Sequence, residues 1–64
     1  MNRRHLIEAL RAVAERLKEN LRIDKYSPEF REQIRDEIKI ILDSADELER
    51  LENLENAIKR IFNL

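Results

Sequence analysis

The sequence predicts an all-α protein: a single domain over residues 1–64, folded as an antiparallel up-down-up bundle of three helices. Apolar residues recur at intervals of three and four almost throughout, as they do on the buried face of an amphipathic helix. Glycine is absent and proline occurs once, so few positions favour a turn. Charged residues make up 42% of the chain and fill the intervening positions, which indicates solvated outer faces.

The first helix is predicted over residues 3–22. Asn2 stands just before it, and asparagine caps helix N-termini with its side-chain oxygen. The apolar residues of this segment fall within a sector of about 120° on a helical wheel: Leu6, Ile7, Leu10, Val13, Ala14, Leu17 and Leu21. This face is expected to pack against the rest of the bundle.

The second helix is predicted over residues 28–42, after a loop that begins at Asp24. Ser27 is a good N-cap, and Pro28 suits the first helical position because its missing N–H would have no partner there. Proline also disfavours helical geometry at the residue before it. The apolar residues from here onward form a stripe about 80° wide: Phe30, Ile34, Ile38, Ile41 and Ala45.

A third helix is predicted over residues 45–63, because the apolar stripe changes phase. On one unbroken helix, the later stripe of Leu51, Leu54, Ile58, Ile61 and Phe62 would lie roughly 130° from the earlier one. Ser44-Ala45-Asp46-Glu47 also reads as a capping box, which predicts a short turn at residues 43–44. The alternative is a helical hairpin with one long helix, about 54 Å long, that self-associates into a dimeric bundle.

The distribution of charge supports three helices. In an up-down-up bundle, the first and third helices run parallel and their N-termini are neighbours. Arg3 and Arg4 are therefore expected beside the acidic residues of the third helix: Asp46, Glu47 and Glu49. Such exposed pairs are worth at most about 1 kcal/mol each, so they indicate topology more than they stabilise it.

The composition argues against catalysis, metals and cofactors. Without cysteine or glycine, the chain can form neither thiolate metal sites nor phosphate-binding loops. His5 is the only histidine and is expected on the solvated face of its helix. The two serines, Ser27 and Ser44, are explained as N-caps. We therefore expect no enzyme, no cofactor, no metal site and no small-molecule substrate.

Nucleic-acid and membrane binding are not expected either. The last predicted helix, where a DNA-reading helix would carry basic residues, is net acidic, and the isoelectric point is about 5.8. No apolar run approaches the ~20 residues of a membrane span. The N-terminus lacks the apolar segment of a signal peptide. The chain is expected to be soluble, and cytoplasmic if it is natural or recombinant.

The remaining apolar residues are candidates for a contact with another chain. Ile40 points well away from the stripe of its own predicted helix and is expected to face the third helix of the bundle. On the alternative continuous helix, it would instead join the later stripe. The candidate interface residues are Ile40, Leu51, Leu54 and Ile58.

The chain as a whole resembles de novo designed helical bundles and mini-binders. The features that carry this resemblance are the Ser27-Pro28-Glu29 helix start, the Ser44-Ala45-Asp46-Glu47 cap, leucine and isoleucine stripes, and dense Glu/Arg/Lys pairs on the surface. Five asparagines and an excess of arginine over lysine keep a small natural helical protein as the alternative.

The resemblance implies a structural, non-catalytic scaffold, or a helix face made to bind one partner. The expected function is therefore the scaffold. The alternative function is a protein-binding module that presents an apolar helix face to one protein partner or, as a homo-oligomer, to a second copy of itself.

Overall fold

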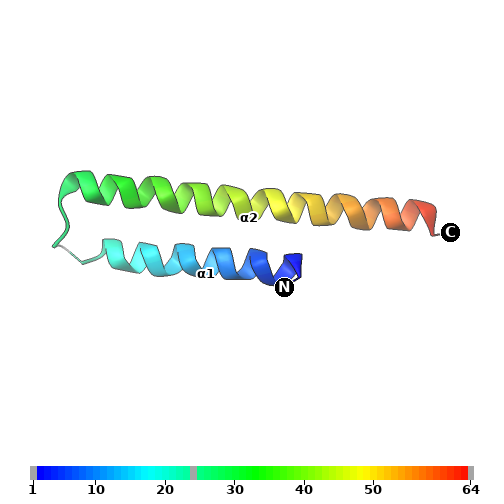
Figure 1. Ribbon diagram of the computed structural model, residues 1–64, viewed down its shortest axis with the longest axis horizontal. Coiled ribbons are helices and arrows are strands. Elements are labelled where there is room, and N and C mark those ends of the chain that lie inside the picture. The colour runs from blue at the N-terminus through cyan, green and yellow to red at the C-terminus, as the bar shows by residue number, and fades with distance from the viewer. Residues whose placement is uncertain (1, 24, 64) are drawn as a thin grey trace.

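The computed structural model describes residues 2–23 and 25–63, and over these ranges the chain is a hairpin of two antiparallel helices (Figure 1). Helix α1 spans Arg3–Leu21 and helix α2 spans Pro28–Phe62. The predicted three-helix bundle, with separate helices at 28–42 and 45–63, is therefore wrong. The alternative with one long helix fits the structure. Asp24, at the start of the predicted loop, lies outside the described residues.

Side-chain caps start both helices where the sequence predicts. The Asn2 Oδ1 atom accepts a hydrogen bond from the backbone N–H of His5 at 2.7 Å. The Ser27 Oγ atom accepts one from the N–H of Phe30 at 3.2 Å. Pro28 occupies the first helical position of α2, where no backbone donor is lost. These local signals are sufficient to define the N-termini of both helices.

The predicted turn at residues 43–44 is absent, and Ser44 is not an N-cap. A capping serine accepts a hydrogen bond from the backbone N–H of a later residue, whereas Ser44 donates one to an earlier residue. Its hydroxyl donates to the carbonyl oxygen of Ile40, one turn earlier, at 2.8 Å. A serine bonded in this way sits in the interior of a helix. No glycine or proline interrupts the segment, so every residue across it can keep helical geometry.

The core is a narrow seam between the two helices. Its buried residues are Ile7, Ala14, Ile34, Ile38 and Ala45. Ala14 and Ala45 are fully buried, and side chains of this size allow two helix backbones to approach closely. Half-buried leucines and isoleucines flank the seam: Leu17, Leu21, Ile41 and Leu42. Helix α1 thus packs on the first apolar stripe of α2.

The two helices differ in length, and this difference positions the candidate site. Helix α1 has 19 residues and α2 has 35, or about 28 Å and about 52 Å. The C-terminal extension, defined here as residues 53–62, is exposed except at Ala57 and projects beyond α1 (Figure 1). The radius of gyration is 16.2 Å, against about 11 Å for a compact domain of this length.

Candidate interaction surface

The four candidate interface residues all lie on α2 and all are exposed. Their exposed fractions are 65% for Ile40, 36% for Leu51, 50% for Leu54 and 45% for Ile58. Ile40 has no third helix to face within the described residues, so the expectation that it packs inside a bundle is wrong. Ile61 and Phe62 continue the same series and are 64% and 81% exposed. We call these six residues the uncovered stripe.

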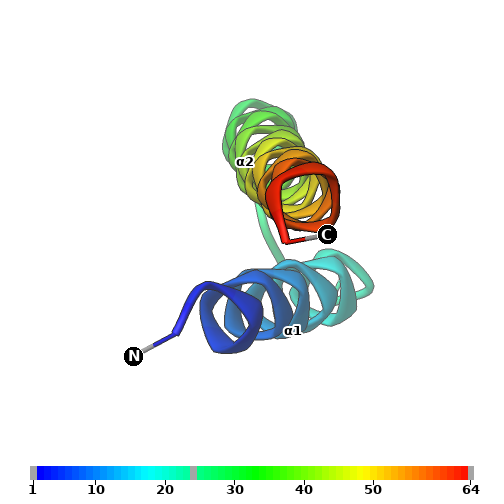
Figure 2. The ribbon, with the colours of Figure 1, turned by 90° about the vertical axis from the view of Figure 1, so that its right-hand side faces the viewer.

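The change of phase that suggested a helix break has a different physical cause. On the continuous helix, the uncovered stripe lies roughly 130° around α2 from the residues that touch α1. The first stripe faces α1, whereas the second faces away from it. The view along the molecule shows α1 on one side of α2 and no further helix of the described residues on its other sides (Figure 2). Two apolar faces on one helix indicate two packing partners, and the described residues supply only one of them, α1.

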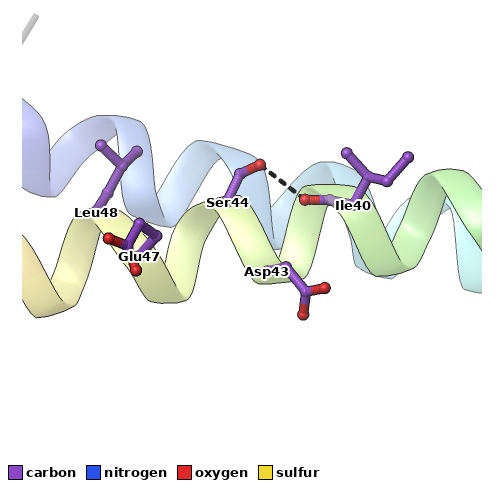
Figure 3. Close-up of a pocket in the computed structure, with 5 residues that line it drawn as sticks. All are labelled: Ile40, Asp43, Ser44, Glu47 and Leu48. Atoms are coloured by element: carbon purple, nitrogen blue, oxygen red, sulfur yellow. Dashed lines mark hydrogen bonds between the residues drawn. The ribbon is translucent and has the colours of Figure 1, made fainter.

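A hollow on α2 lies at the N-terminal end of the uncovered stripe (Figure 3). Its lining residues are Ile40, Asp43, Ser44, Glu47 and Leu48. They follow one another at helical spacing, and α1 contributes no wall. Sequence reasoning missed the hollow as a site because it placed a turn at Ser44. The signal that could have found it is the three- and four-residue spacing that starts at Ile40.

The partly covered apolar side chains of α1 lie on the same side of the hairpin as the uncovered stripe. Leu6 is exposed, and Leu10, Val13 and Leu17 are half-buried. On the wheel of α1, they lie at one edge of the seam with α2, and Arg4 and Arg11 lie at the other edge. The hairpin therefore has one apolar side and one charged side.

Ion pairs join α1 to α2 on the charged side of the hairpin. Arg4 Nη1 lies 2.8 Å from Glu49 Oε2, and Arg11 donates to both oxygens of Glu49 at 3.2 Å. Arg11 Nη2 also lies 3.0 Å from Asp46 Oδ1. Hydrogen bonds from Arg11 and then Arg4 lower the pKa of Glu49 to about 2. The paired carboxylate stabilises the antiparallel packing of α1 on the middle of α2.

These contacts correct the expected charge pattern in detail. The pair between Arg4 and Glu49 forms, but through antiparallel helices and not through two parallel ones. Arg3 bonds to Glu55 at 2.9 Å, because the N-terminus of α1 lies beside the later part of α2. Glu47 pairs within its own helix, with Arg50 at 2.6 Å. Because α2 is longer than α1, its acidic residues between Asp46 and Glu55 lie beside the N-terminal half of α1 and pair with the arginines there.

The other residues considered from the sequence lie apart from this surface. His5 is exposed on α1, and Ser27 acts as an N-cap. No cluster of metal-ligating side chains occurs in the described part of the chain. None of the helices over residues 2–23 and 25–63 is long and apolar enough to cross a membrane. The chain matches no protein-family model, no curated protein and no solved structure.

Proposed function

We propose that this chain is a protein-binding module whose binding surface is the uncovered stripe, and that its partner is a second copy of itself. The observation that carries the proposal is a series of exposed apolar side chains on one face of α2, dense from Leu51 to Phe62 and preceded by Ile40, that α1 is too short and wrongly placed to cover. Contiguous exposed apolar patches on small proteins commonly mark interaction sites.

The exposed area supports a partner of about the size of the chain itself. The hairpin exposes 5262 Å², whereas a compact monomer of this mass exposes roughly 4,400 Å². The excess, roughly 900 Å², is close to the ~800 Å² that each partner buries in a standard protein interface. One copy of the same hairpin can supply the matching area.

The chemistry of the stripe also fits self-association. Leucine, isoleucine and phenylalanine at helical spacing pack against a similar helix by inserting side chains between side chains. A two-fold symmetric contact requires only that one surface be complementary to itself, and a single apolar stripe meets that requirement. The scaffold alternative, by contrast, assigns no partner to these residues.

A matched pair of variants tests the proposal. Ile58→Glu places a charge in the uncovered stripe, and Asn53→Glu places the same charge on the opposite face of the same extension. Sedimentation velocity at about 100 µM should show dimers for the wild type and for Asn53→Glu. Ile58→Glu should raise the dissociation constant about 100-fold or more, because its carboxylate would be buried without a partner.

Two results would contradict the proposal. In the first, all three proteins sediment as monomers, which would leave the scaffold reading. In the second, Ile58→Glu and Asn53→Glu weaken association equally, which would mean that the effect comes from net charge and not from the stripe. Circular dichroism of both variants checks that α2 remains helical.

A further inference from the structure

We propose that the second copy binds antiparallel to the first, with Ile58 of each copy inserted into the hollow of the other. This inference rests on the proposed self-association and adds its geometry. The hollow is the one lined by Ile40, Asp43, Ser44, Glu47 and Leu48. It gives the uncovered stripe a receptor site with a defined set of lining residues.

The hollow has the shape that receives a side chain from a facing helix. Ile40, Asp43, Ser44 and Glu47 stand at positions i, i+3, i+4 and i+7, the four corners of a hole in helix–helix packing. The surface dips at Ser44 because the serine side chain is small. The Ser44 hydroxyl already donates to the Ile40 carbonyl oxygen at 2.8 Å (Figure 3). An apolar side chain can therefore cover Ser44 without leaving its donor unpaired.

Placing Ile58 in the hollow determines the rest of the pairing. With Ile58 opposite Ser44, the two-fold axis passes beside Leu51, which lies midway between them in α2. Leu54 then lies beside Leu48 of the other copy, and Phe62 lies beside Ile40. Leu51, Leu54 and Phe62 each gain an apolar neighbour in this register, Ile58 covers the hollow, and the segment from Ile40 to Phe62 forms a contact about 33 Å long.

The charges favour the antiparallel orientation over the parallel one. Residues 36–47, around the hollow, carry one basic side chain, Lys39, and five acidic ones: Asp36, Glu37, Asp43, Asp46 and Glu47. Residues 56–62 carry Lys59 and Arg60 and no acid. An antiparallel pair places the basic segment of each copy over the acidic segment of the other. A parallel pair would place the acidic segments of the two copies side by side, and their repulsion disfavours the parallel orientation.

The antiparallel orientation also accounts for the unequal helix lengths. Each extension lies beyond its own α1 but alongside the first half of the other copy's uncovered stripe. The extension of one chain thus covers the hollow of the other, and the reverse holds by symmetry. In a parallel pair, the two hollows would face each other with their acidic rims together.

Cysteine cross-linking tests the orientation, because the chain has no cysteine of its own. Ser44→Cys and Ile58→Cys are made as two separate single variants, mixed in equal amounts and oxidised in a glutathione buffer. Mass spectrometry then distinguishes the mixed disulfide dimer from the two homodimers. We expect the mixed dimer to exceed each homodimer about tenfold or more, because only an antiparallel pair brings residues 44 and 58 within disulfide reach.

Asn53→Cys mixed with Ser44→Cys is the matched control, since residue 53 lies on the opposite face, and it should give no preference for the mixed dimer. Predominance of the Ile58→Cys homodimer would overturn the antiparallel pairing, as would equal amounts of all products. The molar mass of each reduced variant separates the two proposals. Monomers throughout would overturn both, whereas dimers with the wrong cross-link would overturn the geometry alone.

Discussion

Arg11 holds both carboxylate oxygens of Glu49 from across the hairpin, with its Nη1 3.2 Å from Oε2 and its Nη2 3.2 Å from Oε1. A two-point contact of this kind fixes both distance and direction. Because the residues come from different helices, the pair aligns the first half of α1 with the middle of α2. This register places the seam on one face of α2 and leaves Ile40 and the later members of the uncovered stripe exposed.

The stability of the hairpin should fall in acid because of Glu49. Its pKa is lowered from 4.5 to about 2 in the folded chain. A carboxylate with a depressed pKa stabilises the fold above its unfolded pKa, and this contribution is lost as the pH falls through the folded value. Urea denaturation between pH 6 and about pH 2 should show a larger loss for the wild type than for Glu49→Gln.

Glu32→Gln is the control for this measurement, since Glu32 is exposed and lies on the side of α2 away from α1. This variant should keep the wild-type dependence on pH. If Glu49→Gln also loses stability as steeply as the wild type, the pair with Arg11 does not hold the two helices together. Added salt should weaken the same contribution, because the pair lies at the surface.

Alanine substitution of the two serines tests the continuity of α2. Ser27→Ala removes the cap on the N–H of Phe30 and should cost about 0.5–2 kcal/mol. Ser44→Ala should change the free energy of unfolding by no more than about 0.5 kcal/mol, because alanine is the better helix former inside a helix. A loss at residue 44 as large as that at residue 27 would indicate a cap, and therefore a break in α2.

Ile7→Ala should be among the most damaging single truncations in the hairpin. Ile7 is the largest side chain that is fully buried in the described part of the chain. Removing its buried carbons should cost about 2–5 kcal/mol, measured by urea denaturation at one fixed protein concentration. Ile23→Ala is the control, because Ile23 is 43% exposed in the loop region, and it should cost less than about 1 kcal/mol. Equal losses would contradict the position of the seam.

The amide protons of the extension should exchange at a rate that depends on protein concentration. Alone, residues 56–62 have no packing partner among the described residues and should open readily. In the dimer, they lie against the second copy, so their exchange should slow about tenfold or more between about 10 µM and about 1 mM. Amides of the seam, such as that of Ile38, provide the internal reference. Unchanged exchange in the extension at both concentrations would argue against its burial in a dimer.

Local signals in the sequence predicted the helix starts well. Asn2 and Ser27 are caps because each needs only the backbone of the next turn as its partner. At Ser44, where the sequence Ser-x-x-Glu fits a capping box, the prediction of a further helix start was wrong. A cap requires the chain to leave helical geometry, and nothing in the segment favours that change. The hydroxyl therefore bonds back to the carbonyl of Ile40.

The sequence could predict which residues form the candidate surface, but not the shape of that surface. Helical spacing identified Ile40, Leu51, Leu54 and Ile58 as one stripe on a continuous helix, and the structure provides that helix. The hollow beside Ser44 and the free extension could not be predicted, since both depend on where α1 ends relative to α2. That relation is set by contacts between residues distant in sequence, such as Arg3 with Glu55.

Sedimentation equilibrium of the wild-type chain tests the central claim most directly. The claim is that a second copy covers the uncovered stripe. From about 5 µM to about 1 mM, the molar mass should rise from 7.8 kDa toward twice that value, and fit a single monomer–dimer equilibrium. A mass that stays at 7.8 kDa over the whole range would contradict the claim, since the stripe would then remain exposed in a stable monomer.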